Sequence, residues 1–407
     1  MKKENNFLSI RWLYLVVGMF SMLFAGIIYA WSILKNPLAA EFGWGASILA
    51  VNFTLTMCFF CIGGFLGSQV AKKIGVSAAV IISGILSGVG FVLTSMLTGN
   101  VGLLYITYAG MAGLGIGVSY NVIISTVNAW FPDKAGLSSG CLLMGFGFST
   151  LLFGTLLDAM FRSEAFGWRK TFVLFGIATA VVLIIAGVIL KRPDDNVVFP
   201  TANKKASVKK ESFEARDYTT GEMVKRFTFW RAFLCLSCIV AVGNSVISFA
   251  RDLAVSVDAS EALATTLVGV LAVCNGLGRI LTGALFDAVG RRQTMLASNL
   301  LTIIAAGITL LAVIISSLPL CVLGLCLTGL SYGSGPTLCS AFVSSFYGRK
   351  YFATNYSIIN FTLMAASLVA TVSSKLLISF GTYVAPFVLL LVLSGVALVL
   401  NLSIKRP

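Results

Sequence analysis

Twelve long apolar segments constrain the fold of this chain more strongly than any other feature of its sequence. Each is close to the roughly 20 residues that a helix needs to cross a bilayer. They lie near residues 11–35, 46–71, 77–97, 101–130, 136–160, 170–190, 228–250, 261–286, 293–316, 319–346, 353–377 and 382–403. Only 11% of the residues are charged, about half of the share that is usual in soluble domains. The pattern predicts an all-α membrane protein with 12 transmembrane helices, and it excludes a soluble enzyme or a disordered chain.

The segments form two sets of six, separated by the one long polar stretch of the sequence. We therefore predict an N-terminal six-helix bundle at residues 1–191, a linker at 192–226 and a C-terminal six-helix bundle at 227–407. The two halves also resemble each other, because Ser119-Tyr120 in the fourth segment mirrors Ser331-Tyr332 in the tenth. Repeats of this kind predict two pseudo-symmetric halves that rock about a substrate site at their interface.

The distribution of lysine and arginine predicts the orientation of the chain. An even number of spans places both termini on one side of the membrane. Of the 29 Lys and Arg residues, six fall on the opposite side and Arg279 falls inside a span, which leaves 22 on the side of the termini. The positive-inside rule therefore predicts cytoplasmic termini and a cytoplasmic linker, in the plasma (cell inner) membrane.

Two motifs resemble the signatures of a known transporter family. The loop Gly283-x-x-x-Asp287-x-x-Gly290-Arg291-Arg292, after the eighth segment, resembles the signature of the major facilitator superfamily. The resemblance implies the fold of that superfamily, with a conformational or gating role for Asp287, Arg291 and Arg292.

A second motif gives a narrower resemblance. Residues 128–136 read Asn-Ala-Trp-Phe-Pro-Asp-Lys-Ala-Gly, similar to the Asn-x-Trp-Phe-Pro-Asp-Lys-x-Gly signature of the oxalate/formate antiporter family, which also includes monocarboxylate carriers. Residues 29–32, 220–223 and 355–357 agree with the same family. By this resemblance Asp133 and Lys134 join the gating residues.

Arg279 places a positive charge inside the eighth span, and this charge needs an explanation. It lies eight positions before Asp287, or about 12 Å along a helix. A charge near the bilayer centre costs at least about 2.5–3.5 kcal/mol and usually marks a substrate or ion path. All 15 acidic residues map to loops or span ends, so an anionic substrate is the expected counter-charge. A structural arginine paired with a buried acid is the alternative.

The chemistry of Arg279 favours a small organic acid as that substrate. A guanidinium group binds a carboxylate through two parallel hydrogen bonds, which suits an organic acid better than a sugar. Asn275 lies one helical turn away on the same face. It could donate a second hydrogen bond to the carboxylate, or it could instead form an interhelical bond.

The family resemblance also implies the charge of the substrate. Members that carry a dianion have a second cation, a lysine, in the eleventh span. Counting from Asn355-Tyr356-Ser357, that position is Leu363 here. A second carboxylate would be desolvated and unpaired, so we expect a monocarboxylate in preference to a dicarboxylate such as oxalate.

Aromatic residues are expected to form the rest of the pocket. The resemblance implies that Tyr29, Tyr120 and Tyr332 close around the anion, while Phe146 replaces a tyrosine and Thr328 replaces a tryptophan. The pocket would then be roomier and less polar on those two sides, although each residue could equally serve helix packing. The further candidates for substrate contact are Tyr356, Asn360 and Tyr383.

These observations predict a secondary active transporter of small monocarboxylates, lactate-like organic anions, that works by alternating access with proton coupling. Asp258, near a span end, is the candidate proton-coupling residue, and the alternative is that the bound acid itself carries the proton. The alternatives are an organic anion exchanger of the oxalate/formate type and a non-transporting membrane sensor. The chain contains no histidine and no nucleophile–base pair, so we expect no enzyme activity, cofactor or metal. The expected partners are a small carboxylate, protons and the lipid bilayer, with no nucleic acid, and the expected state is a monomer.

Overall fold

The structure is a computed structural model that describes residues 2–193 and 216–405. These ranges are helical and contain no β-strand. Twelve of the helical stretches are long and apolar enough to cross a membrane, and each coincides with one of the twelve predicted segments. The all-α membrane fold class is thereby confirmed.

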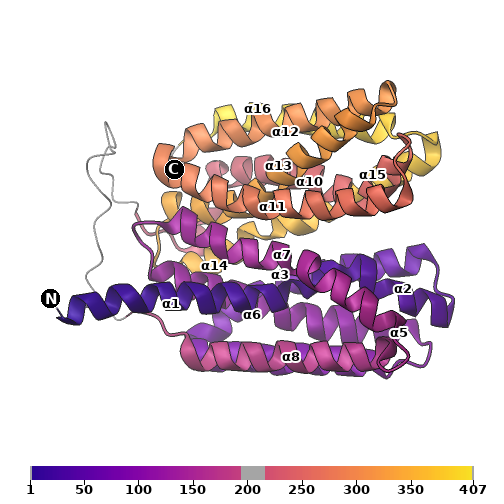
Figure 1. Cartoon of the computed structure of the whole chain (residues 1–407). Coiled ribbons are helices and arrows are strands. Elements are labelled where there is room, and N and C mark those ends of the chain that lie inside the picture. The colour runs from indigo at the N-terminus through magenta and orange to yellow at the C-terminus, as the bar shows by residue number, and fades with distance from the viewer. Residues whose placement is uncertain (1, 194–215, 406–407) are drawn as a thin grey trace. The chain divides into compact units, whose positions relative to one another are not determined.

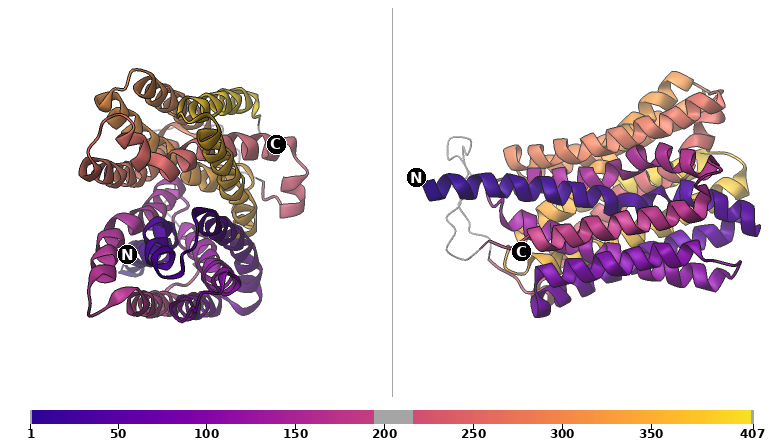
Figure 2. Two further views of the ribbon diagram at one scale, coloured as in Figure 1. Left: turned by 90° about the vertical axis from the view of Figure 1, so that its right-hand side faces the viewer. Right: turned by 60° about the horizontal axis from the view of Figure 1, so that its bottom comes forward.

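The chain divides into two compact units, which are coloured by residue number in Figure 1. The described part of unit 1 covers residues 2–133 and 141–193, and that of unit 2 covers 134–140 and 216–405. The start of the fifth span therefore belongs to unit 2. Of the predicted linker at 192–226, residues 194–215 lie outside the described part of the chain. In the end-on view of Figure 2, the spans of each unit are seen nearly along their axes.

Unit 1 holds the first six spans, apart from the first turns of the fifth. Its helical segments are α1 (Lys2–Ala25), η1 (Gly26–Ala30), α2 (Trp31–Phe42), α3 (Ala46–Ile74), α4 (Val76–Ser95), α5 (Val101–Leu104), η2 (Tyr105–Gly113), α6 (Leu114–Ala129), α7 (Ala135–Arg162) and α8 (Gly167–Ile189). Helix α3 packs along α6, and α4 packs along α8. The first contact depends on Gly117, where a Cβ would overlap the carbonyl oxygen of Phe60. Glycine thus lets two membrane helices approach closely.

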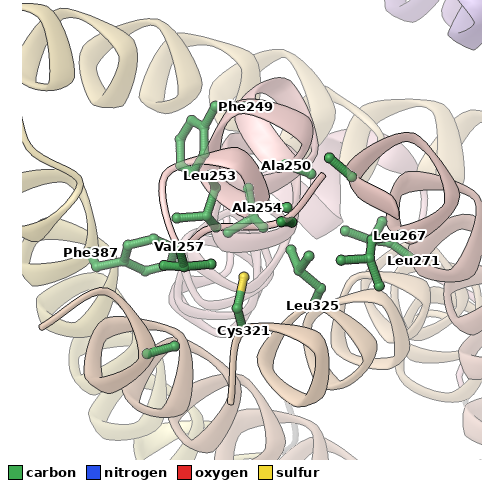
Figure 3. Packing of buried hydrophobic residues seen from close by; sticks show 14 of the residues in the cluster. Phe249, Ala250, Leu253, Ala254, Val257, Leu267, Leu271, Cys321, Leu325 and Phe387 are labelled. Carbon is green, nitrogen blue, oxygen red and sulfur yellow. The ribbon is translucent and has the colours of Figure 1, made fainter. Parts of the chain in front are cut away.

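Unit 2 holds the other six spans and a short helix that precedes them. Its helices are α9 (Thr220–Val224), α10 (Phe227–Val255), α11 (Glu261–Val289), α12 (Arg291–Ile314), α13 (Leu318–Phe346), α14 (Phe352–Ile359), α15 (Phe361–Phe380) and α16 (Val384–Ser403). An apolar cluster fills the space where α10 ends and α11 begins, and Figure 3 shows its members Leu253, Val257, Leu267, Cys321 and Phe387.

Three of the spans are not continuous α-helices. The first contains the 3₁₀ turn η1, the fourth contains the π-helical segment η2, and the eleventh is divided at Asn360 into α14 and α15. The break in the first span has a packing cause, because a Cβ on Gly26 would overlap the carbonyl oxygen of Phe146 in α7. Local 3₁₀ and π segments often mark hinges or functional sites.

Candidate functional site

Arg279 lies inside α11 and is almost fully buried, with 2% of its surface exposed. Its Nε donates a hydrogen bond to Oδ1 of Asn275 at 3.2 Å. The structure therefore brings the two predicted residues together as neighbours one turn apart. This bond uses Nε and fixes the orientation of the guanidinium plane. The two Nη groups of Arg279 are not involved in this bond. The fork that they form is the edge of arginine that matches a carboxylate.

Helix α13 packs tightly on the face of α11 that carries this pair. A Cβ on Gly333 would overlap the backbone oxygen of Asn275, and the Thr337 hydroxyl donates to the carbonyl oxygen of Arg279 at 3.4 Å. Two predicted pocket residues, Thr328 and Tyr332, lie on the same helix and are buried. The small residues of α13 thus bring its backbone against the turn that contains Arg279.

An aromatic cluster in unit 1 unites three of the predicted pocket residues. The ring of Phe146 lies 5.2 Å from that of Tyr29 and 5.0 Å from that of Tyr120, both in edge-on geometry. Phe60 of α3 completes the cluster, with its ring 4.9 Å from Tyr120 and 5.9 Å from Phe146. Such pairs are stabilising beyond their buried area. The cluster joins η1, α3, α6 and α7.

Sequence reasoning missed Phe60. It is 2% exposed, and nothing in its local sequence separates it from the other phenylalanines of the spans. Its role depends on the register of α3 against α6, which no short motif encodes. The contact with Gly117 gives a signal only after that register is known.

The candidates in the eleventh and twelfth spans occupy different environments. Leu363 and Asn360 are buried near the break in the eleventh span, where the Leu363 amide donates to the Asn360 carbonyl at 2.9 Å. Tyr356 is fully buried and stacks on Phe352. Tyr383 lies elsewhere, because its ring packs 5.5 Å from Phe249 against the apolar cluster of Figure 3.

Asp287 joins the end of α11 to the start of α7 within unit 2. Its carboxylate accepts hydrogen bonds from the backbone amides of Gly136 at 3.0 Å and Leu137 at 2.8 Å. A carboxylate at a helix N-terminus satisfies unpaired amides and complements the helix dipole. The start of α7 also contacts α13, where the hydroxyls of Ser139 and Ser340 are 2.7 Å apart.

The other predicted gating residues make separate contacts. Asp133 forms a largely buried ion pair with Arg11 of α1, in which Oδ1 of Asp133 accepts a hydrogen bond from the guanidinium at 2.9 Å. The guanidinium of Arg291 lies 5.0 Å from the ring of Phe346, while Lys134 and Arg292 are exposed. Arg11 is a second residue that sequence reasoning missed, because its partner is 122 positions away.

Asp258 lies in the exposed turn between α10 and α11, in a left-handed backbone conformation with φ of 66°. Arg279 lies 18 positions after Glu261, or about 27 Å along the helix. The structure therefore does not bring Asp258 to Arg279. Among the described residues, no group of three or more Cys, Asp or Glu side chains is arranged to hold a metal ion.

Comparison with known proteins gives the family of this fold. The model of the Major Facilitator Superfamily matches residues 13–253 and 232–407. An uncharacterized MFS-type transporter, YhjX, of Escherichia coli is 26% identical over 360 residues, covering 87% of this chain and 85% of the relative. The oxalate:formate antiporter of Oxalobacter formigenes is 25% identical over 418 residues and covers 94% of both chains. Monocarboxylate transporter 12 of Mus musculus is 24% identical over 349 residues, covering 80% of this chain and 70% of the relative.

Solved structures agree with this result at the level of the fold. The proton:xylose symporter XylE superimposes with a TM-score of 0.76 at 14% identity, covering 98% of this chain and 96% of the symporter. The transporter FucP, in its outward conformation, gives a TM-score of 0.69 at 13% identity, covering 97% and 99%. The relatives confirm the resemblance inferred from the motifs, and this chain belongs to the Major Facilitator Superfamily as a multi-pass membrane transporter.

Proposed function

We propose that this protein is a secondary active transporter of small monocarboxylates that works by alternating access. The observation that carries the proposal is Arg279, a guanidinium 2% exposed inside a span and hydrogen-bonded to the uncharged amide of Asn275. Intramembrane arginines of this kind mark substrate paths. Two relatives that cover most of this chain are named as an oxalate:formate antiporter and a monocarboxylate transporter.

The substrate carboxylate binds to the Nη fork of Arg279 in this proposal. Asn275 orients the guanidinium by accepting a hydrogen bond from Nε. In this proposal the side-chain amide nitrogen of Asn275 donates a further hydrogen bond to the anion. The remaining proposed contacts are Tyr29, Tyr120, Phe146, Thr328, Tyr332, Tyr356, Asn360, Leu363 and Tyr383, of which Tyr383 packs on Phe249 in the structure. The tyrosine hydroxyls donate to the anion while the rings exclude water.

Leu363 sets the preference for one carboxylate over two. It is 6% exposed and stands where dianion carriers of the family place a lysine. A second carboxylate beside it would lose its hydration without gaining a cation, which is costly in a buried site. Lactate-like acids are therefore favoured over oxalate.

Proton coupling is the proposed energy source. Asp258 is exposed and distant from Arg279 along α11, and the amide of Asn275 does not titrate at physiological pH. These placements favour a proton that travels with the acid over one relayed by Asp258. The second candidate function is anion exchange, which the name of the relative from Oxalobacter formigenes favours.

We further propose the topology expected from the distribution of Lys and Arg. In it, both termini and the linker at 192–226 are cytoplasmic, the bundles are those of residues 1–191 and 227–407, and the transporter acts as a monomer. The contact of Asp287 with the start of α7 opens and closes during the cycle. Arg291, Arg292, Asp133 and Lys134 are the other proposed gating residues.

Counterflow in proteoliposomes tests the transport proposal. Vesicles loaded with unlabelled lactate, acetate, formate or oxalate are diluted into the labelled form of the same acid. We expect transient accumulation of the monocarboxylates and much less of oxalate. A non-transporting sensor would give no accumulation with any acid, whereas oxalate as the best substrate would overturn the assignment of Leu363.

A further inference from the structure

A basic and aromatic surface lies at one end of unit 2, where three parts of the chain meet. Residues 228–231, in the first turns of α10 and just after the corner with α9, lie against residues 403–405, where α16 ends. The hydroxyl of Thr228 donates to the carbonyl oxygen of Lys405 at 3.0 Å, and Arg231 donates to that of Ser403 at 3.1 Å. The first turn of α12 reaches the same strip, because Arg291 donates to the carbonyl oxygen of Ile404 at 3.4 Å.

The cations of this surface are exposed. Lys225, Arg226, Arg231 and Lys405 all present their side chains to the outside. None of the four forms an ion pair with another residue of 2–193 or 216–405. Positive charge from segments about 180 positions apart is thus concentrated on one strip of the surface.

The nearby acidic groups are engaged elsewhere. Glu222 pairs with Arg216 and accepts hydrogen bonds from Thr219. Asp287, four residues before Arg291, binds the amides at the start of α7. Neither carboxylate neutralises the strip.

Large apolar side chains border the same cations. Phe227 is 81% exposed, Trp230 is 48% exposed and Leu402 is 64% exposed. Phe227 and Leu402 lie at the ends of predicted spans. Trp230 is fixed at the corner by the bond from its indole nitrogen to the carbonyl oxygen of Val224 at 2.8 Å. Exposed aromatic residues at span ends are typical of the level of the lipid headgroups.

We propose that this surface is a binding site for an anionic phospholipid. The phosphate and the acidic headgroup lie among Lys225, Arg231 and Lys405, and the acyl chains run along Phe227, Trp230 and Leu402. Arginine pairs with phosphate through two hydrogen bonds, and lysine contributes a point charge. Basic clusters beside membrane spans attract anionic lipids at this level of the bilayer. The charge and the apolar border together fit a lipid better than a soluble phosphate, which would use only the cations.

Lipid binding to the purified transporter tests this proposal. The protein in a neutral detergent is titrated with phosphatidylglycerol or with phosphatidylcholine, and bound lipid is counted by native mass spectrometry. We expect preferential retention of phosphatidylglycerol by the wild-type chain. In the variant Lys225→Gln/Arg231→Gln/Lys405→Gln, each lost cation weakens that binding roughly fivefold.

A matched control removes the same number of charges elsewhere. The variant Lys73→Gln/Lys191→Gln/Lys350→Gln changes three exposed lysines and should keep the preference for phosphatidylglycerol. Because Arg231 also bonds to Ser403, the double variant Lys225→Gln/Lys405→Gln tests the site without changing that contact. It should still lose most of the preference.

Three results would overturn the proposal. In one, the triple variant keeps the wild-type preference. In another, the control loses it to the same extent, so that only total charge matters. In the third, glycerol phosphate displaces phosphatidylglycerol at equal concentration, which would identify a site for a soluble phosphate ester instead of a lipid.

Discussion

At the scale of single residues, the transport chemistry that we propose centres on one buried guanidinium, that of Arg279. Placing a charge inside a span costs at least about 2.5–3.5 kcal/mol, so the residue persists only where the protein or a ligand compensates for it. Part of that compensation is local, because Asn275 accepts the Nε proton of Arg279. The bond uses an uncharged acceptor, so it does not by itself neutralise the guanidinium. A positive site is what an anionic substrate needs.

Arg279→Lys should abolish or sharply reduce carboxylate binding while the protein remains folded. Lysine keeps the charge but loses the planar fork that makes two parallel bonds. The measurement is the increase in Tm on addition of substrate. As a control, Arg251→Lys changes an exposed arginine that pairs with Glu261 and should retain the full increase. An undiminished shift in Arg279→Lys would remove Arg279 from the binding site.

Leu363→Lys should weaken lactate-like transport and improve the binding of a small dicarboxylate. The new cation supplies a partner for the second carboxylate, which otherwise is desolvated without compensation. The ranking of substrates in counterflow checks this prediction. Leu363→Gln separates the effect of polarity from that of charge and should not improve dicarboxylate binding. Monodispersity must be established first, and a well-folded Leu363→Lys variant with the wild-type ranking would contradict the charge argument.

At the scale of elements, the ends of helices carry much of the specific bonding. The start of α7 is capped by a carboxylate from α11, through the amides of Gly136 and Leu137. The short helix α9 is closed by a capping box, in which Thr219 and Glu222 exchange hydrogen bonds. Both contacts lie beyond the apolar parts of the spans. At these positions a charged group needs little compensation.

Asp287→Asn should loosen the start of α7. The amide keeps an acceptor oxygen but loses the charge that complements the helix N-terminus, which is worth about 1 kcal/mol, or roughly a factor of five. Hydrogen exchange at the amides of Gly136 and Leu137 should accelerate by about that factor, with slower transport. Asp252→Asn, the same change at an exposed position of α10, should leave both unchanged. Equal exchange rates in the two variants would contradict a capping role for Asp287.

The capping box of α9 should depend on pH. The pKa of Glu222 is held below its ordinary value of 4.5 because the backbone and hydroxyl of Thr219 donate to the carboxylate and Arg216 lies beside it. A lowered folded pKa means that the stabilisation is complete above pH 4.5 and is lost as the pH falls through the lowered pKa. Protection of the Met223 amide from hydrogen exchange, corrected for the intrinsic rate, should fall in that acidic range. In Glu222→Gln it should be low already at neutral pH and show no such step.

At the scale of the whole molecule, the transport cycle that we propose depends on the charge of Arg279. A bound monocarboxylate forms a neutral pair with the guanidinium, so the loaded carrier reorients without moving net charge through lipid. The empty carrier returns with its positive site unfilled, at a cost of at least a few kcal/mol. A second anion that returns in exchange relieves that cost in an exchanger. A proton-linked step relieves it in a symporter.

An inward proton gradient should drive labelled monocarboxylate into liposomes that contain no internal substrate. This outcome follows if the proton accompanies the acid, which the placement of Asp258 favours over a relay. Asp258→Asn should then keep gradient-driven uptake. Uptake that appears only after the lumen is preloaded with a carboxylate, whatever the gradient, would establish the exchanger in place of the symporter.

Local chemistry was enough to predict the spans and the proximity of Asn275 to Arg279. In lipid every backbone amide must bond within its own segment, so a long apolar run forms a helix wherever it lies in the chain. Asn275 and Arg279 share a face because they are four residues apart. In contrast, the break at η1 depends on how Gly26 meets the carbonyl of Phe146, about 120 residues away.

The sequence by itself determined the number of spans and the position of Arg279 inside one of them. Only the tertiary structure decided that Phe60 joins Tyr120 and Phe146, that Asp287 caps α7, and that Tyr383 packs on Phe249. The physical reason is the sequence separation of the interacting residues. Helix formation in lipid is settled within about 20 residues, whereas ring contacts and helix caps require the register of segments up to 151 positions apart.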